Sequence, residues 1–264
     1  MRASTPPGSS MRTGSAAGQP ALRAQHLTKS YHSPILRDLD LDVEQGQFVA
    51  IMGPSGSGKS TLLHCLSGMD RPDAGSVLLG GTEITSLSEK ELAALRLTRF
   101  GFVFQQAHFM TTLCLLDNIV LPGFLAGLRP RPEVTARGKE LMERMGIAEL
   151  ATSGVTEVSG GQLQRAGICR ALINDPGIVF ADEPTGALNS ATALQILDLL
   201  GEIHAAGTTL VMVTHDAQVA ARADRVLVLV DGRIMEDLLL GGYEEAEGPS
   251  RLATVTEALQ RHSV

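Results

Sequence analysis

A run of nine residues has the composition and spacing of a phosphate-binding loop. Glycines at this spacing allow backbone N–H groups to surround an anion, assisted by the positive end of the helix that follows. Lys59 is placed to reach the β- and γ-phosphates of a nucleotide, and Ser60 to ligate Mg²⁺. The run therefore predicts nucleotide binding, against the alternative of a chance glycine-rich turn. Its residues are Gly53, Pro54, Ser55, Gly56, Ser57, Gly58, Lys59, Ser60 and Thr61.

Two adjacent carboxylates end a short apolar run further along the chain. Asp182 and Glu183 follow Ile178–Ala181, which we interpret as a buried strand. Because adjacent strand residues point to opposite faces, the two acids need not share one task. We expect Asp182 to hold Mg²⁺, directly or through water. We expect Glu183 to polarise the water that attacks the γ-phosphate, a contribution of ~10²–10⁴ in rate. Without a phosphate loop, the pair would be interpreted as solvated acids after a strand.

A second glycine-rich segment, far downstream of the phosphate loop, predicts another anion site. Ser159 and Gln162 have the spacing of a capping box, so a helix should begin there. Gly160 and Gly161 leave the N–H groups of that helix end open to an anion. One chain cannot easily bring two helix ends to the same phosphate, whereas two copies about a two-fold axis can. Without the phosphate loop, an ordinary capped helix would be the preferred interpretation.

Apolar periodicity indicates the elements that must position these residues. Phe48–Met52 is a continuous apolar run that enters the phosphate loop, and Leu62–Leu66 follow at helical spacing. Residues 22–50 alternate as antiparallel strands do, whereas 88–157 are expected to form a mostly helical insertion. Further downstream, strands alternate with a helix, which predicts a parallel sheet covered by helices. These elements are expected at Ile178–Ala181, Ser190–Ala206, Thr209–Val213 and Val226–Val230, with a hairpin turn at Asp231-Gly232 into Arg233–Glu236.

Composition and charge narrow the classes of protein to which the chain can belong. Its 264 residues allow one large domain or a core with a smaller subdomain. A net charge of −7 makes a nucleic-acid-binding surface unexpected. No apolar run approaches the roughly 20 residues of a membrane span, so we expect a soluble chain whose membrane role would need a partner. The three cysteines, Cys65, Cys114 and Cys169, match no metal-ligand spacing and suit a reducing cytosol.

The order of these motifs resembles that of the ATPase subunit of an ATP-binding cassette (ABC) transporter, over roughly residues 22–240. Val158–Gln162 is similar to the family signature, with Val where Leu is more usual. The resemblance makes Gln105 the glutamine that senses Mg²⁺ and leads into the surface docking the membrane subunit. It makes His215 the switch histidine that contacts the γ-phosphate, and Tyr31 the aromatic residue that stacks on adenine. Each of these three residues, taken alone, would be interpreted as structural.

The resemblance implies an α/β fold with a RecA-like P-loop NTPase core, an antiparallel β subdomain and a helical subdomain. Within the tail, residues 241–250 are expected to be loose, with a short amphipathic helix near Leu252–Leu259. The expected division is a disordered leader at 1–20, an ABC ATPase domain at 21–240 with the helical subdomain inserted at about 88–175, and a C-terminal tail at 241–264.

The segment from Asp182 to Ser190 resembles most closely the ATPases paired with FtsX-like permeases, in lipoprotein-release, macrolide-export and bacitracin-resistance systems. The resemblance implies ATP and Mg²⁺ as ligands and a homodimer whose ATP-driven closure powers a separate permease, docked near Gln105–Leu121. It implies a location on the cytoplasmic face of the cell membrane and no nucleic-acid partner. The alternative is a non-transport ATPase that drives mechanotransmission or senses antimicrobial peptides through a membrane partner.

Two other classes of protein account for less of the sequence. A DNA-repair or chromosome-organising ABC ATPase would carry a long coiled-coil or zinc insertion, and the sequence contains neither. A simple P-loop kinase gives no account of residues 158–165.

One residue departs from the family pattern. Asn189 stands in the D-loop, where the family usually carries Asp. Asn keeps the size and the hydrogen-bonding reach of Asp but removes a charge at the expected dimer seam. The hypothesis is slower hydrolysis or weaker coupling between two sites, against neutral drift.

Overall fold

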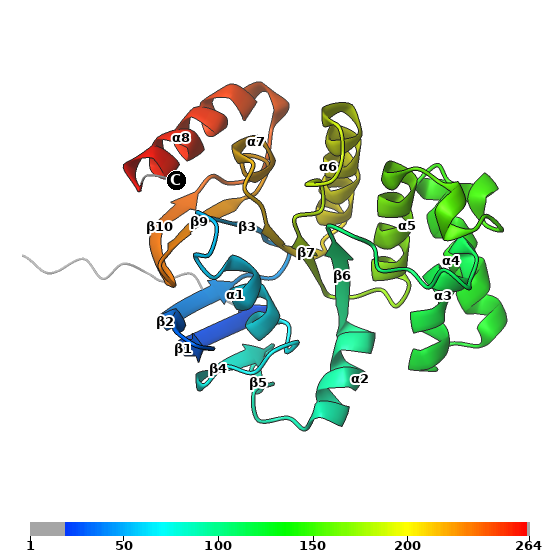
Figure 1. Ribbon diagram of the computed structural model, residues 1–264, viewed down its shortest axis with the longest axis horizontal. Helices are drawn as coiled ribbons and strands as arrows, with labels where there is room; N and C mark the ends of the chain where they lie inside the picture. The colour runs from blue at the N-terminus through cyan, green and yellow to red at the C-terminus, as the bar shows by residue number, and fades with distance from the viewer. Residues whose placement is uncertain (1–18, 263–264) are drawn as a thin grey trace, which may run out of the picture.

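A computed structural model describes residues 19–262 of the chain (Figure 1). The leader expected at 1–20 lies outside the described residues, apart from its last two positions. Within the described part, none of the helices combines the length and the apolar character needed to cross a membrane.

The core of the molecule is a six-stranded sheet in the order β10-β9-β3-β8-β7-β6. Neighbouring strands are parallel except for β10, which pairs with β9 as an antiparallel hairpin. The predicted parallel sheet, the strand entering the phosphate loop and the hairpin turn are therefore confirmed. The strands are β3 (Phe48–Met52), β6 (Phe100–Phe104), β7 (Ile178–Asp182), β8 (Thr209–Val213), β9 (Arg225–Val230) and β10 (Arg233–Leu239).

A second, antiparallel sheet is built mainly from the N-terminal part of the chain, in the order β2-β1-β4-β5. Its alternating apolar residues point to one side, as the sequence pattern indicates. The strands are β1 (Leu22–Ser30), β2 (Pro34–Val43), β4 (Ala74–Leu79) and β5 (Thr82–Glu83).

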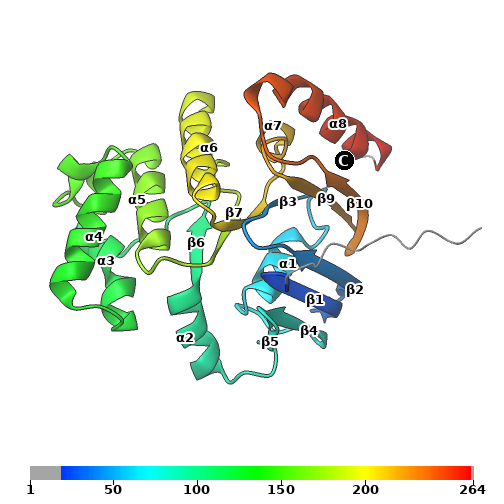
Figure 2. The ribbon, with the colours of Figure 1, turned by 180° about the vertical axis from the view of Figure 1, so that it is seen from behind.

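The two faces of the main sheet belong to different hydrophobic clusters. Successive strand residues point to opposite faces, so Val49 and Ile51 join the cluster shared with α1 and the antiparallel sheet. Ala50 and Met52 face the other way and pack in the cluster that holds α6 and α8. The sheet is thus covered on both sides, as Figures 1 and 2 show. The covering helices are α1 (Lys59–Leu66), α6 (Ser190–Ala205), α7 (Ala217–Ala220) and α8 (Gly248–Arg261).

The segment expected to be mostly helical is interrupted by a strand of the main sheet. β6 lies within 88–157 and pairs with β7 at the edge of the sheet. Apolar periodicity in flanking segments favoured helix, whereas Phe100 and Phe102 pack against Phe180 of β7 and hold this stretch as a strand. The helices around it are α2 (Glu89–Arg99), α3 (Leu115–Ala126), α4 (Arg131–Arg144) and α5 (Gly160–Leu172), with short 3₁₀ turns at Ala148–Leu150 and Val155–Glu157.

The C-terminal segment is more ordered than the sequence indicates. A 3₁₀ turn covers Glu245–Glu247, and α8 begins at Gly248, within the range expected to be loose. Arg251 is buried and donates to the carbonyl oxygens of Ala223, Gly241 and Gly242, each at 2.7 Å. The buried guanidinium of Arg251 thus links α8 to Ala223 and to the segment at Gly241 and Gly242. Composition alone does not indicate this contact.

Candidate active site

The phosphate loop joins β3 to α1 and has the backbone that the sequence predicts. Gly53 has φ +151°, and a Cβ there would lie 2.0 Å from the carbonyl oxygen of Leu229. Gly58 has φ +103° and is the residue before α1 begins at Lys59. Only glycine tolerates both the left-handed backbone and the close approach. The loop is therefore fixed by packing against its neighbours as well as by its role as an anion cradle.

Lys59 lies folded over this loop. Its Nζ donates to the carbonyl oxygens of Gly53 and Pro54, both at 2.9 Å. Burial lowers the pKa of Lys59 below its usual value, while the nearby Glu183 and Asp182 oppose that shift. An ammonium in a partly desolvated loop interacts strongly with any phosphate that enters. The position of the Lys59 ammonium at the phosphate loop therefore fits its predicted role in binding the β- and γ-phosphates of a nucleotide.

Ser60 and Asp182 meet at the start of α1 and the end of β7. The Ser60 hydroxyl donates to Oδ1 of Asp182 at 3.2 Å. Hydroxyl and carboxylate oxygens are ligands that Mg²⁺ accepts, and Mg²⁺ usually takes only one or two protein carboxylates, with water and substrate phosphates completing its shell. No cluster of three or more His, Cys, Asp or Glu suited to a metal occurs among residues 19–262. The small donor set therefore fits Mg²⁺ held together with a nucleotide.

Glu183 has a different environment from its neighbour Asp182. Its carboxylate accepts a hydrogen bond from Nδ1 of His215 at 2.7 Å. Its backbone is left-handed, with φ +47°, and its N–H donates to the carbonyl oxygen of Val213 at 3.0 Å. Such a backbone costs about 1–3 kcal/mol and is held in place by its surroundings. Asp182 and Glu183 therefore have different hydrogen-bond partners, Ser60 and His215, although they are adjacent in the chain; their separate tasks stay a prediction.

Gln105 directly follows β6 and comes close to the turn after Glu183. A Cβ added at Gly186 would lie 2.9 Å from Nε2 of Gln105. The glutamine amide is therefore packed against the loop that follows the acidic pair, and its contact with Mg²⁺ stays a prediction.

Two residues of α5 that sequence reasoning missed hold the segment around Gln105. The Gln164 amide, which is buried, donates to the carbonyl oxygen of Phe104 at 3.0 Å. The Arg170 guanidinium donates to the carbonyl oxygens of Ala107 and His108, at 2.5 and 3.4 Å. Burial lowers the pKa of Arg170 to about 10. The available signal was polar side chains placed among the apolar residues of the predicted helix.

The capping box at Ser159 is confirmed as the start of α5. The Gln162 N–H donates to the Ser159 hydroxyl at 3.3 Å, and the Ser159 N–H donates to Gln162 Oε1 at 2.8 Å. In Figures 1 and 2, α5 lies on the far side of α6 and β7 from α1. The structure therefore does not bring this helix end to the phosphate loop of its own chain.

Asn189 caps α6 beside the Ser159 turn. Its side-chain oxygen accepts the N–H of Thr192 at 3.0 Å, a role that sequence reasoning did not assign. A Cβ at Gly161 would lie 2.5 Å from the Thr192 side chain, whereas one at Gly160 would meet nothing closer than Leu188, at 3.8 Å. Of the two signature glycines, Gly161 packs too closely against α6 to accept a Cβ, whereas Gly160 has room for one.

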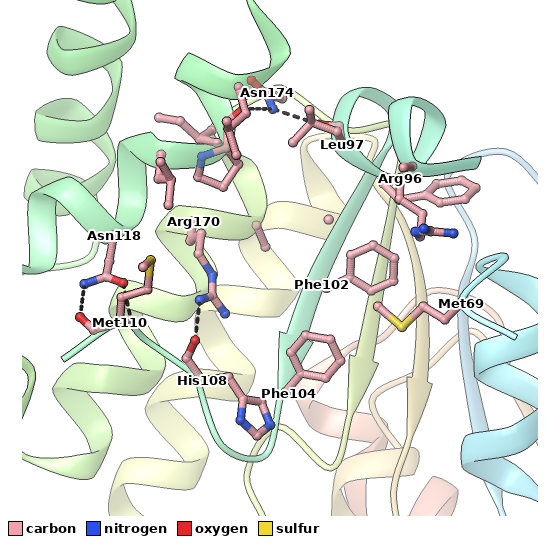
Figure 3. Close-up of a pocket in the computed structure, with 18 residues that line it drawn as sticks. Met69, Arg96, Leu97, Phe102, Phe104, His108, Met110, Asn118, Arg170 and Asn174 are labelled. Carbon is pink, nitrogen blue, oxygen red and sulfur yellow. Dashed lines mark hydrogen bonds between the residues drawn. The ribbon is translucent and has the colours of Figure 1, made fainter. Parts of the chain in front are cut away.

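An apolar groove of about 520 Å³ lies between α2, β6, α3 and α5 (Figure 3). Phe102 and Phe104 line it from the strand, and Arg170 from α5. Asn118 is buried and donates to the carbonyl oxygens of Met110, Leu113 and Cys114, which holds the rim in place. Leu121 lies in the lining, so the groove overlaps the range expected to dock a partner. Three large apolar side chains of its lining are exposed, namely Met69, Met110 and Leu125.

Comparison with known proteins gives a consistent family. The family model described as "ABC transporter" matches residues 36–186. The chain is 44% identical over 237 residues to the macrolide export ATP-binding/permease protein MacB 1/2 of Paracoccus denitrificans, covering 88% of this chain and 35% of that protein. It is 48% identical over 202 residues to MacB of Rhodopseudomonas palustris, covering 76% and 31%. The chain thus spans about a third of the length of these curated relatives.

Solved structures agree with this result. A dimeric structure of the ATP-binding cassette MJ0796, in a post-hydrolysis state bound to ADP and Pi, is 35% identical with a TM-score of 0.75, covering 84% of this chain and 100% of that one. CbiO1 from Clostridium perfringens, part of an ABC transporter complex, is 26% identical with a TM-score of 0.77, covering 92% and 97%.

Proposed function

This chain belongs to the ABC transporter family, and from that premise we propose that it drives a separate FtsX-like membrane permease. It is an ATP-binding and ATP-hydrolysing protein, and the expected ABC ATPase fold class is confirmed. One observation carries the nucleotide part of the proposal: Ser60 of the phosphate loop meets Asp182, and Glu183 meets His215, while α5 lies on the far side of α6 from α1. The boundaries of the ATPase domain and of its helical subdomain remain predictions.

In the proposed reaction, the backbone N–H groups of the loop and Lys59 hold the β- and γ-phosphates of ATP. Glu183 orients the attacking water and accepts its proton, and its hydrogen bond to His215 holds the carboxylate in place. A Mg²⁺ held by Ser60 and Asp182, with Gln105 near it, would offset the charge of the phosphates. Tyr31 would stack on the adenine.

The site becomes complete only when a second copy supplies its Ser159 turn. A homodimer about a two-fold axis gives each nucleotide one phosphate loop and one α5 N-terminus. ATP then closes the dimer, and hydrolysis with release of phosphate opens it. Shifting such an equilibrium from 1:99 to 99:1 needs about 5.5 kcal/mol of differential binding. Two nucleotides that bridge the chains, each with several charge-assisted contacts, supply this binding free energy in the proposed dimer.

The apolar groove is the proposed docking site for the permease. It is apolar, its rim is held by buried hydrogen bonds, and it lies next to the loop that contains Gln105. A helix or turn from a membrane subunit can cover Leu125 and its exposed neighbours there, as an interface core requires. Docking would hold the chain on the cytoplasmic face of the cell membrane.

Transport is the favoured role within this family. The similar proteins are named macrolide export ATP-binding/permease proteins, which supports a role in transport over mechanotransmission or peptide sensing. The choice of substrate is assigned to the permease, since this chain contributes the nucleotide site and a docking surface.

Replacing Glu183 by Gln tests the catalytic part of the proposal. Gln keeps the shape of the side chain and an oxygen for His215, so the fold should persist. Hydrolysis should fall by ~10²–10⁴ while ATP binding is retained, and the ATP-bound dimer should accumulate on size exclusion. Turnover near the wild-type rate would remove Glu183 from the base role.

Replacing Leu125 by Glu tests the docking part. Leu125 is 67% exposed, so the charge should not unfold the chain, but it should abolish co-purification with the membrane subunit. Leu239→Glu is the matched control, because Leu239 is 76% exposed at the edge strand β10, outside the lining of the groove. Equal retention of the membrane subunit by both variants, or stable co-purification with DNA instead, would contradict the docking site.

A further inference from the structure

Tyr31 is an exposed aromatic residue whose orientation is nevertheless fixed. It directly follows β1 and is 59% exposed. Its hydroxyl donates to Oδ2 of Asp70 at 2.5 Å, across 39 positions of sequence. The hydrogen bond to Asp70 and partial burial raise the pKa of Tyr31 above its usual value. An exposed tyrosine without such a bond would sample several rotamers.

Asp70 is itself held firmly. Its Oδ1 accepts from Nζ of Lys29 at 2.8 Å, and Lys29 is 8% exposed. Lys29 also donates to the carbonyl oxygen of Arg71 at 2.7 Å and lies 5.0 Å from the centre of the Tyr31 ring. One side of the ring is therefore approached by a buried ammonium. Burial raises the pKa of Asp70, but the hydrogen bonds from Lys29 and Tyr31 outweigh it, so the pKa lies below its usual value.

The tether joins Tyr31 to the helix that carries the phosphate loop. The N–H of Asp70 donates to the carbonyl oxygen of His64, in the last turn of α1, at 3.1 Å. The other end of α1 begins at Lys59, directly after the loop. The eight residues of α1 span about 12 Å. Asp70 therefore fixes Tyr31 relative to the element that holds the phosphates.

We propose that Asp70, held by Lys29, is a positioning residue that presets Tyr31 for the base of the nucleotide. The inference rests on the proposed function, in which Tyr31 stacks on adenine. A preset ring avoids the loss of side-chain entropy when the nucleotide binds, so removing the tether should weaken ATP binding about two- to tenfold. Phosphate contacts and the chemical step should be unaffected, because Asp70 touches neither.

The experiment uses Asp70→Asn, Tyr31→Phe and the double variant. Tyr31→Phe keeps the ring and removes only its tether, and Asp70→Asn keeps an oxygen for Lys29. Each single variant should raise KM for ATP with kcat unchanged, and the double variant should raise it no further. Inorganic tripolyphosphate, which has no base, should inhibit all variants with the same affinity as wild type.

A spectroscopic readout follows from the composition. The chain has no tryptophan and two tyrosines, so Tyr243→Phe leaves Tyr31 as the single reporter. In that background, Asp70→Asn should lower the pKa of the Tyr31 phenol measured by ultraviolet titration, because the neutral phenol loses its carboxylate acceptor. A structural effect elsewhere would leave this pKa unchanged.

The outcomes separate two failures. If Tyr31→Ala leaves ATP affinity unchanged, the stacking role in the proposed function is wrong. If Tyr31→Ala weakens ATP binding but neither Asp70→Asn nor Tyr31→Phe does, the positioning role is overturned. Weakened binding of tripolyphosphate by the same factor as ATP also overturns it, since the damage would then lie in the phosphate loop. Should Asp70→Asn fold poorly, Tyr31→Phe alone decides between these outcomes.

Discussion

Two inactive variants should restore activity when they are mixed. Lys59→Ala removes the ammonium from the phosphate loop, and Gly160→Asp places a carboxylate at the start of α5, where the partner's γ-phosphate is proposed to bind. Both should fold. Within residues 19–262, the Lys59 ammonium donates to two loop carbonyls and to no other group, and a Cβ at Gly160 lies 3.8 Å from its nearest neighbour, Leu188. A carboxylate near the N-terminus of a helix stabilises that helix by about 0.3–1 kcal/mol, so the new Asp side chain should not unfold α5.

The expected recovery of activity depends on the distance in space between α5 and α1 of one chain, because each site then takes its two halves from different chains. A dimer of either variant has two defective sites. A mixed dimer has one complete site, built from the loop of the Gly160→Asp chain and the α5 end of the Lys59→Ala chain. Random pairing of an equal mixture makes half of the dimers mixed, so the rate should recover to about a quarter of wild type if the sites act independently.

The assay is phosphate release by each variant and by their mixture. Two different affinity tags show that mixed dimers form, and Gly160→Ala, which adds a Cβ without charge, serves as the control for bulk. Mixed dimers that form but hydrolyse no faster than the single variants would refute the two-chain site. A wild-type rate for Gly160→Asp alone would do the same, since the α5 end would then not face a phosphate.

Three further outcomes are expected. Asn189→Asp should keep the cap of α6 and raise ATPase turnover or cooperativity, whereas Asn189→Ala should lose about 1 kcal/mol of stability. The hydrogen bond to Asp224 raises the pKa of His204 in the folded protein, so the protonated imidazole stabilises the fold. This stabilisation is fully present below the usual pKa of about 6.5 and is lost as the pH rises through the raised pKa of the folded state. Urea unfolding at several pH values measures the change in the free energy of unfolding. Cys169, whose pKa burial raises to about 12, should resist thiol reagents that label partly exposed Cys114.

Each of these outcomes has a result that contradicts it. Unchanged turnover and cooperativity in Asn189→Asp would favour neutral drift. A His204→Gln variant whose stability keeps the same dependence on pH would show that another group is responsible. Labelling of Cys169 in the folded protein at the rate of Cys114 would show that the packing around α5 opens in solution.

Features that depend only on residues close together in the sequence could be predicted from the sequence. The phosphate loop, the strand that enters it and the helix that leaves it depend on glycine spacing and apolar periodicity, both local properties. The start of α5 was predicted because Ser159 and Gln162 satisfy each other across three residues. Asp182 and Glu183 were identified in the same way, as polar residues that end a buried strand.

Contacts between distant segments were decided only by the tertiary structure. Nothing local to Phe100–Phe104 specifies that this stretch is an edge strand beside β7, because that depends on aromatic contacts across the sheet. The bond from Tyr31 to Asp70 likewise depends on where β1 ends relative to α1. Strand order also sets α5 apart from α1, and the proposed role of the Ser159 turn in the site of a second chain rests on this separation. Sequence periodicity specifies which face of an element is buried, but the order in which elements pack specifies which residues meet.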